Sequence, residues 1–273
     1  MTLRLAGPLL LVGAGKMGGA LLEGWLRQGL DPAAVFLQDP APAPEVLSLA
    51  ARHAIAASTA PDLPAAPSVI VVAVKPDLVA KLLPEIEPMI EQGTVILSIA
   101  AGRTLESLAR ALPPGTAIVR AMPNTAAAVG SSMTVACANA AVTAEQVAEC
   151  TALLEAVGDV VWLDDENLLD AVTAVSGSGP AYVFLLAECL AEAGRAAGLD
   201  AALAQRLARA TVVGAGALLA QSDLSPHELR EKVTSPKGTT AAALEVLMGK
   251  DGVQELLKRA VAAAAKRSRE LSS

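Results

Sequence analysis

The sequence predicts an α/β fold in which a parallel sheet with crossover helices is followed by a second, all-helical domain. Two observations predict this order. In the first half, short β-branched runs alternate with helical patterns, which is typical of a sheet built from βαβ units. From about Glu166 onward there is no convincing strand, and long Ala/Leu-rich helical patterns are separated by Gly, Pro and Ser. We expect the first domain to span residues 1–164 and the second residues 165–273.

The first half contains the apolar runs and helical periodicities of such an alternating fold. The expected strands are Leu9–Val12, Val35–Leu37, Val69–Val74, Val95–Ile99, Ala117–Arg120, Met133–Ala136 and Val160–Leu163. The expected helices are Met17–Gln28, Glu45–Ala51, Leu78–Ile90, Leu105–Leu112 and Ala144–Val157. Near-continuous apolar strands such as Val69–Val74 suit a sheet that helices cover on both faces.

Composition excludes several classes of function. Of the 273 residues, 53% are hydrophobic and 18% charged, which favours a folded globular protein. A net charge of −7 and 2% aromatic residues argue against a nucleic-acid partner. Cys137, Cys150 and Cys189 lie far apart, so we expect neither a metal site nor a disulfide framework. The apolar run Ala210–Ala220 is too short to span a bilayer, so we expect a cytoplasmic protein with no membrane partner.

The helical domain carries more apolar surface than it can easily bury alone. In the predicted helix Ala181–Ala197, apolar side chains surround the axis, and Glu188, Glu192 and Arg195 form only a narrow polar strip. A helix that is apolar nearly all round must be buried on most sides, and a small domain cannot readily do this for several helices. We therefore expect an obligate homodimer formed through this dimerisation domain. The alternative is a compact monomer with close Ala packing.

The first strand is followed by a glycine-rich loop that opens the first helix, Gly13-Ala14-Gly15-Lys16-Met17-Gly18. The pattern is weak alone, but its strand–loop–helix context is that of a Rossmann-type dinucleotide-binding domain. Gly13 permits the tight turn, Gly15 lets the backbone approach a pyrophosphate, and Gly18 allows close helix–strand packing. The N–H groups at the helix start then face the phosphates. We expect this loop to bind NAD or NADP, whose reduced form is the hydride donor; a structural glycine turn is the alternative.

Asp39 ends the second strand, roughly 20 residues beyond the glycine loop. A carboxylate at this position accepts hydrogen bonds from an adenosine ribose 2′-hydroxyl and repels a 2′-phosphate. No Arg or Lys follows until Arg52, so the sequence shows no built-in clamp for that phosphate. We interpret Asp39 as a cofactor-binding residue that accepts NADH; the alternative is a cap for the turn before Pro40.

Three further strand ends have loops suited to a cofactor. Ligands of open α/β sheets bind at the carboxyl ends of strands, although each loop could be an ordinary strand-to-helix turn. Lys75 is expected to act through its backbone more than its ammonium group. The cofactor-binding residues expected in these loops are Ala73, Val74, Lys75 and Pro76, then Ala100, Ala101 and Gly102, and finally Asn124.

The usual catalytic groups are scarce. His53 and His227 lie in surface-like stretches, and there is no GxSxG, HExxH or paired-carboxylate signature. The chemistry must therefore need little proton transfer by the protein. Hydride transfer to a preformed iminium meets this condition, because the substrate nitrogen already carries the proton and positive charge. The protein then mainly orients two reactants.

In the second domain, the hydroxyl-rich loop Thr234–Thr240 opens a predicted helix at Ala241. Hydroxyls together with free N–H groups at a helix N-terminus form an anion site that fits a substrate carboxylate. A plain N-cap explains one of these hydroxyls but not the whole cluster. The segment Ser176–Pro180 precedes a long helix and could contribute similarly or simply break the chain.

At these residues the chain resembles pyrroline-5-carboxylate reductase over essentially its whole length. The motifs GAGKMG, AVKP, SIAAG, RAMPNT, AVSGSGPAY and TSPKGTT occur in the family's order and at compatible spacing. The resemblance implies reduction of 1-pyrroline-5-carboxylate to L-proline, the last step of proline biosynthesis. It also implies a helical dimerisation domain, dimers that can assemble into decamers, and an active site between the cofactor domain and the dimer partner.

Matched position by position, the family's carboxylate-binding loop corresponds to Ser235, Gly238, Thr239 and Thr240. The resemblance implies that Thr240 acts in catalysis by hydrogen bonding near the imine nitrogen. It also implies that Glu166 is a substrate-side carboxylate, for which a charge at a helix N-terminus is the alternative.

Two positions depart from the family pattern. Lys237 replaces the usual first glycine of the SPGG loop, so it either adds charge near the carboxylate or points to solvent. Asp39 stands where relatives often carry a hydroxyl or basic residue for the NADPH phosphate. This departure leaves the preference between NADH and NADPH open.

Other functions fit parts of the sequence. A 3-hydroxyacid dehydrogenase-like enzyme, like another imine reductase, would also join such a domain to helices. A hydroxyacid dehydrogenase needs a Lys or His base near a hydroxyl, and the second-domain helices lack an evident candidate at their centres. A non-catalytic nucleotide-sensing module is a further alternative, which turnover would distinguish from an enzyme.

Overall fold

The computed structural model describes residues 3–272, and the chain forms two compact units. The first unit runs to Gly177 and also includes the chain from Ala265 onward; the second unit is Ser178–Ala264. The chain returns to the first unit within the last helix, where Ser268 donates a hydrogen bond to Asp170 at 2.6 Å. The expected division at residues 164 and 165 stays a prediction, and residues 1, 2 and 273 of its ranges lie outside the described residues.

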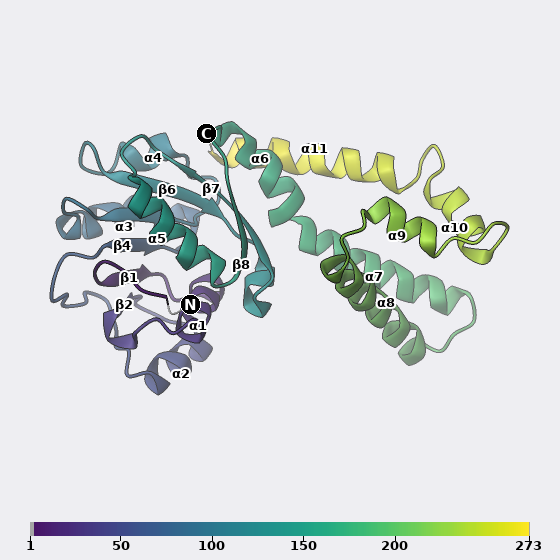
Figure 1. Ribbon diagram of the computed structural model, residues 1–273, viewed down its shortest axis with the longest axis horizontal. Helices are drawn as coiled ribbons and strands as arrows, with labels where there is room; N and C mark the ends of the chain where they lie inside the picture. Colours follow the sequence, from purple (N-terminus) through teal and green to yellow (C-terminus); the bar gives the residue numbers. More distant parts are fainter. Residues whose placement is uncertain (1–2, 273) are drawn as a thin grey trace. The chain divides into compact units, whose positions relative to one another are not determined.

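The first unit is built on one eight-stranded sheet with the order β3-β2-β1-β4-β5-β6-β7-β8 (Figure 1). The strands are β1 Leu9–Val12, β2 Val35–Gln38, β3 Ala57–Ser58, β4 Val69–Val72, β5 Val95–Ser98, β6 Ala117–Met122, β7 Ser132–Ala138 and β8 Gly158–Trp162. From the neighbouring strands β1 and β4 the sheet extends in both directions, as in a doubly wound fold. Every strand expected from the sequence is present, and only the short β3 was not expected.

The sheet is not parallel throughout, which corrects the expectation from the sequence. β6 and β7 pair antiparallel, with Arg120 opposite Cys137, and β7 then pairs parallel with β8. The physical reason is the connection between β6 and β7, which contains only the short 3-10 helix Thr125–Val129. A parallel connection needs a crossover of a dozen or more residues, usually with an α-helix.

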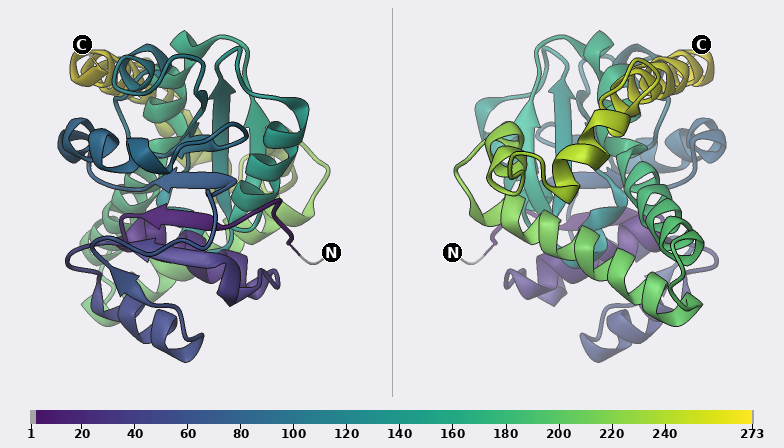
Figure 2. Two further views of the ribbon diagram at one scale, coloured as in Figure 1. Left: turned by 90° about the vertical axis from the view of Figure 1, so that its left-hand side faces the viewer. Right: turned by 90° about the vertical axis from the view of Figure 1, so that its right-hand side faces the viewer.

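Helices cover both faces of the sheet (Figures 1 and 2). They are α1 Lys16–Arg27, α2 Pro44–Arg52, α3 Pro76–Ile86, α4 Leu105–Ala109 and α5 Ala144–Glu155. Leu9 and Leu11 of β1 share a core with side chains of α1, α2 and α5, whereas Leu10 and Val12 share one with α3 and α4. Because both faces are covered, every residue of β1 is buried, which explains its continuous apolar run.

The second unit contains helices only. They are α7 Gly179–Ala196, α8 Ala201–Gln221, α9 Pro226–Lys232, α10 Thr239–Leu247 and the first part of α11 Val253–Ser272. α7 and α8 lie side by side (Figure 1). No residue of α7 is buried, and Phe184 and Leu185 are 64% and 57% exposed. The apolar side chains expected for this helix are therefore present, and no other part of the described chain buries them fully.

One helical stretch, Glu166–Ala196, is long and apolar enough to cross a membrane by length and composition alone, and 6% of its apolar window is buried. The run Ala210–Ala220, which is too short to span a bilayer, lies in α8. The longer stretch is not one regular helix. A 3-10 turn, the short helix α6 Leu169–Val172 and a π-helical turn, Thr173–Gly177, precede α7. An exposed apolar helix of this kind is suited to cover by another chain as well as by lipid.

Candidate functional site

The carboxyl ends of adjacent strands are level with one another in the first unit. The strand pairings place Val12 opposite both Gln38 and Val72, then Val72 opposite Ser98, and Ser98 opposite Arg120. The loops that follow these strands therefore leave one edge of the sheet together. This edge lies at the switch point between β1 and β4, where open α/β sheets bind nucleotides.

The glycine loop connects β1 to α1, as expected, and its three glycines have different surroundings. Gly13 has φ of 101°, and a Cβ on it would lie 2.7 Å from the carbonyl group of Ala73. A Cβ on Gly18 would overlap the carbonyl oxygen of Gly13. A Cβ on Gly15, in contrast, would meet no atom within 4 Å. Gly13 and Gly18 are thus required by packing inside the protein, whereas Gly15 leaves open space beside the backbone.

The start of α1 fits a phosphate group. Gly15 is the N-cap of α1, and no side chain caps the N–H groups of the first turn, which has no acidic residue. Uncapped N–H groups and the positive end of the helix dipole attract anions. Together with the open space at Gly15, this arrangement fits the pyrophosphate of a dinucleotide, and the contacts expected from Lys16, Met17 and Gly18 stay a prediction.

Asp39 follows β2 and joins two loops. Its Oδ2 accepts a hydrogen bond from the backbone N–H of Ala14 at 2.6 Å, and its Oδ1 accepts one from Ala41 at 2.7 Å. The turn-cap role left open by the sequence is therefore present, and the bond to Ala14 also links the carboxylate to the glycine loop. Each oxygen of a carboxylate has two acceptor positions, so both can still accept from a ligand.

A cavity of about 440 Å³ lies beside Asp39, between the ends of β1 and β2 and helix α3. Its lining includes Gly13, Gln38, Asp39, Thr59 and Lys81. Gln38 is only 6% exposed, and among the residues that the structure describes its Oε1 is the buried side-chain oxygen without a hydrogen-bond partner. Reasoning from the sequence missed Gln38, although its place next to Asp39 at a strand end could have indicated it.

The other loops expected to bind cofactor follow the same sheet edge. Lys75 is the N-cap of α3 and Pro76 its first residue, and both are exposed. Ala100 is buried after β5, whereas Ala101 is exposed and Gly102 has φ of 72°. The sheet therefore brings these loops to one edge, and their contacts with a cofactor stay a prediction.

Asn124, which follows β6, forms hydrogen bonds to other residues of the first unit through its side chain and its backbone. Its Oδ1 accepts from the N–H of Ala126 at 3.0 Å, and its Nδ2 donates to Ser176 Oγ at 3.1 Å. Its backbone N–H donates to Ser132 Oγ at 3.0 Å. The side chain thus ties the β6–β7 loop to the π-helical turn Thr173–Gly177, and its proposed contact with cofactor stays a prediction.

Glu166 binds to the sheet of the first unit. Its Oε1 lies 2.6 Å from Nη1 of Arg120 and accepts a hydrogen bond from the N–H of Leu105 at 2.8 Å. The Arg120 side chain is 7% exposed and that of Glu166 25% exposed, so each charge is largely withdrawn from water and stabilised by the other. The sequence did not reveal this pair. A role of Glu166 toward substrate stays a prediction.

Two of the cysteines are buried in the first unit. Burial raises the pKa of the Cys150 thiol to about 12. Burial also raises the pKa of Cys137, and the negative charge of Glu166 adds to the effect. Both thiols therefore stay protonated and unreactive near neutral pH, whereas Cys189 is exposed on α7. No group of three or more His, Cys, Asp or Glu residues suited to a metal ion is found within residues 3–272.

The hydroxyl-rich loop of the second unit lies between α9 and α10. Gly238 is the N-cap of α10 and cannot cap it with a side chain, so the N–H groups of its first turn remain uncapped. A Cβ on Gly238 would lie 2.6 Å from Ser235 Oγ. The hydroxyls of Ser235, Thr239 and Thr240 form no hydrogen bond within the described part of the chain. The sequence predicted that the helix begins at Ala241, whereas α10 begins at Thr239, so that Thr239 and Thr240 are its first two residues. The role of these groups toward a substrate stays a prediction.

Lys237 has a left-handed backbone, with φ of 59°. This conformation is favoured by glycine, and a residue with a side chain adopts it at some cost in free energy. The backbone of the loop therefore keeps the geometry of a glycine although a lysine occupies the position. The side chain of Lys237 is exposed.

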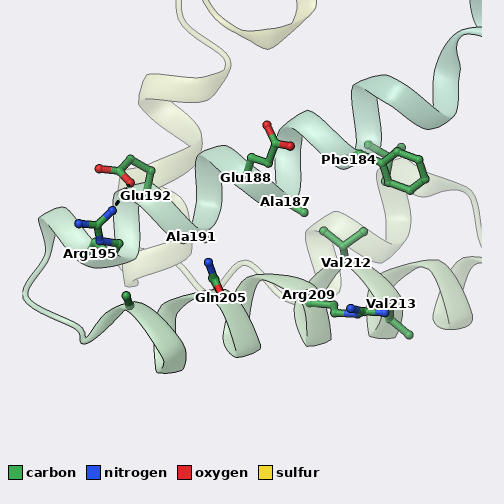
Figure 3. A pocket seen from close by; sticks show the side chains of 12 residues that line it. Phe184, Ala187, Glu188, Ala191, Glu192, Arg195, Gln205, Arg209, Val212 and Val213 are labelled. Atoms are coloured by element: carbon green, nitrogen blue, oxygen red, sulfur yellow. Dashed lines mark hydrogen bonds and ion pairs between the residues drawn. The ribbon is translucent and has the colours of Figure 1, made fainter.

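A larger groove, of about 760 Å³, lies between α7 and α8 (Figure 3). Phe184 and Val213 line one part of it, and the ion pair of Glu192 and Arg195, 3.0 Å apart, lies at another (Figure 3). None of the residues expected to bind cofactor or substrate lines this groove. α7, on one side of this groove, has no buried residue, whereas α8 on the other side has Ala204 and Ala208 buried.

Comparison with known proteins places these features in one family. Residues 166–271 match the family model of pyrroline-5-carboxylate reductase dimerisation, and residues 9–102 match that of NADP oxidoreductase, coenzyme F420-dependent. A pyrroline-5-carboxylate reductase of Pseudomonas aeruginosa is 39% identical over 262 residues, covering 96% of this chain and 95% of that protein. One from Synechocystis is 46% identical over 203 residues, covering 74% of each.

Solved structures agree with the sequence relatives. The structure of a pyrroline-5-carboxylate reductase from Coxiella burnetii has a TM-score of 0.90 and 31% identity, covering 98% of this chain and all of that one. That of Plasmodium falciparum pyrroline carboxylate reductase, with NADP bound, has a TM-score of 0.83 and 28% identity, covering 98% and 99%. The same family is thus found by sequence over nearly the whole length and by fold, and the chain belongs to the pyrroline-5-carboxylate reductase family.

Proposed function

We propose that this chain reduces the C=N bond of 1-pyrroline-5-carboxylate to give L-proline, with NADH or NADPH as the reductant. The observation that carries the proposal beyond family membership is the start of α10. There, uncapped N–H groups and free hydroxyls of Thr239 and Thr240 stand together without an acceptor from the described chain. Such a helix start binds a carboxylate, which the substrate carries.

The two units divide the work of binding. In the first, the N–H groups at the start of α1 bind the pyrophosphate and the open space at Gly15 admits it. Ala73–Pro76 and Ala100–Gly102 would support the rest of the dinucleotide from neighbouring strand ends. The reduced nicotinamide, when bound, supplies the hydride. The protein residues orient it and exclude water from the face that reacts.

In the second unit, Ser235, Gly238 and Thr239 would bind the substrate carboxylate. Thr240, one residue further into α10, would direct its hydroxyl toward the imine nitrogen. Because the iminium form of the substrate already carries a proton on nitrogen, the hydride completes the reduction and no protein base is required. This agrees with the scarcity of His and the lack of a catalytic carboxylate pair in the sequence.

Substitution of Thr240 tests the function. Thr240→Ala should lower kcat for pyrroline-5-carboxylate reduction by about tenfold or more, because one hydrogen bond to the reacting group is lost. Affinity for NAD⁺ or NADP⁺, measured by titration calorimetry, should be unchanged. Thr240→Ser, which keeps the hydroxyl, should restore most of kcat. Oxidation of NADH or NADPH without the imine, or no oxidation with it, would contradict the proposal.

The proposal includes assembly as a homodimer through the second unit, further assembly into decamers and a cytoplasmic location without a membrane partner. It is supported by the exposed apolar face of α7 and by the match of residues 166–271 to the dimerisation model. In this proposal a second copy, rather than lipid, covers the stretch Glu166–Ala196. The protein should then be soluble without detergent and have the mass of a dimer or of five dimers by sedimentation. A protein that requires detergent, or a stable monomer, would contradict this part.

A further inference from the structure

We propose that the cavity beside Asp39 selects a nucleotide with a free 2′-hydroxyl, so that this chain prefers NADH to NADPH. This inference rests on the proposed function for its biological setting, but it concerns only the first unit. All of the lining of the cavity lies between Val12 and Glu85. The second unit, Ser178–Ala264, contributes no residue to this lining.

Asp39 is a fixed negative charge at this cavity. Its two oxygens are held by the N–H groups of Ala14 and Ala41, at 2.6 Å and 2.7 Å. The carboxylate cannot turn away from a ligand without breaking at least one of these bonds. Because Ala14 belongs to the glycine loop, a dinucleotide bound at that loop must present its adenosine ribose near this charge.

The neighbouring side chain, Gln38, carries a second acceptor. Gln38 Oε1 is buried and has no hydrogen-bond donor in the described structure, and Gln38 lines the same cavity. A buried acceptor without a partner is costly unless a ligand or water satisfies it. Asp39 and Gln38 Oε1 are both acceptors. A ligand group that binds Asp39 must be a donor, such as a ribose hydroxyl, and Gln38 Oε1 could accept from a ligand only if its buried amide turned toward the cavity.

A 2′-phosphate has the opposite properties. It carries up to two negative charges and offers acceptor oxygens, so it is repelled by Asp39 and cannot donate to Gln38 Oε1. Lys81 is the only Lys or Arg in the described lining of the cavity. Lys81 is exposed. Glu85, one helical turn further along α3, also lines the cavity, and its negative charge reduces the positive potential of Lys81 there. The cavity therefore lacks a fixed cation for a phosphate.

The measurement compares two ligands that differ only at this group, ADP-ribose and 2′-phospho-ADP-ribose, by titration calorimetry. The full-length protein should bind ADP-ribose about tenfold or more tightly, as expected for a like-charge contact at a partly exposed site. NADH should show the same advantage over NADPH in kcat/KM. Equal affinities, or tighter binding of the phosphorylated ligand, would overturn the inference.

Asp39→Asn removes the charge and should reduce the ratio of the two affinities to about one. An asparagine can supply only one acceptor oxygen to Ala14 and Ala41, so both affinities could fall together, but their ratio isolates the effect of the charge. Asp62→Asn is the matched control, because Asp62 is exposed, lies in the same unit outside the cavity lining and changes the net charge equally. An unchanged ratio in Asp39→Asn would assign Asp39 to the turn alone.

Gln38→Met separates ligand binding from a structural role. Methionine fills a similar volume without an acceptor, so affinity for ADP-ribose should fall about fivefold, as for one neutral hydrogen bond. The thermal midpoint should not fall, because the variant removes an unpartnered buried oxygen. Loss of stability without loss of affinity would overturn the assignment of Gln38. Failure to bind either ligand would overturn the proposed function as well, whereas imine reduction with a preference for NADPH would overturn this inference alone.

Discussion

The two units of this protein bury their apolar residues very differently. In the first unit, Leu97 of β5 is completely buried in the core on one face of the sheet, which includes side chains of α1, α2 and α5. In the second unit, α7 has no buried residue, and Phe184 is 64% exposed. Both segments are strongly apolar, so composition does not explain the difference. The core of the first unit is buried within one chain. The exposed apolar side chains of α7 are instead suited to burial by a second chain.

This comparison predicts that core substitutions in the first unit act on folding. Leu97→Ala should lower the free energy of unfolding by about 2–5 kcal/mol, since it leaves a cavity in a tightly packed core. Urea denaturation measures this loss, which should be the same at low and high protein concentration. Leu47→Ala, at a position that is 45% exposed on α2, is the control and should cost about 0.5 kcal/mol or less. An equal loss of unfolding free energy in Leu97→Ala and Leu47→Ala would contradict the account of a tightly packed core in the first unit.

The two phenylalanines test the difference between the units directly, because each unit contains one of them. Phe184→Ala should weaken self-association by about 2 kcal/mol, or about thirtyfold in the dissociation constant, as for an aromatic contact at an interface. Sedimentation over a range of concentrations measures this change. Phe36→Ala, in β2 against the core of the first unit, should lower stability and leave the dissociation constant unchanged. If Phe184→Ala lowers stability but not association, α7 is not the interface.

The cysteines give the smallest expected effect, seen only at alkaline pH. The folded protein raises the pKa of Cys150 from 9.0 to about 12, so the unfolded chain loses this proton first as pH rises. The stability linked to Cys150 is therefore complete below pH 9 and lost between pH 9 and about 12, amounting to about 1 kcal/mol by pH 10. Cys150→Ala should flatten the decline of stability with pH over that range. Cys189→Ala, which removes an exposed thiol from α7, is the control, and an unchanged slope in Cys150→Ala would contradict the account.

Much of the fold could be predicted because its signals are local. The apolar run of β1, the glycines of the first loop and the turn residues between elements each specify their own conformation. Where the sequence analysis went wrong, as with the direction of β7, the answer depended on the length of a connection. The short β3 carries no pattern, since two residues cannot show a period.

The same distinction between local and long-range signals applies to the candidate site. The start of α10 could be predicted to within two residues because hydroxyls, glycine and helix lie within one short segment. Gln38 and the pair of Arg120 and Glu166 could not, because their roles come from contacts between distant parts of the chain. Asp39 falls between these cases: its place at a strand end is visible in the sequence, but its bond to Ala14 requires the folded loops.

The left-handed backbone of Lys237 has a consequence for how an acid would reach α10. A glycine there would sample many conformations when free, and the turn would become ordered only upon binding. A lysine has fewer accessible states, but most of them lie at negative φ, so the other residues of the loop must hold it in the left-handed conformation. The left-handed backbone of Lys237 thus opposes the order of the turn, whereas its exposed ammonium group adds an attraction for anions that weakens as ionic strength rises.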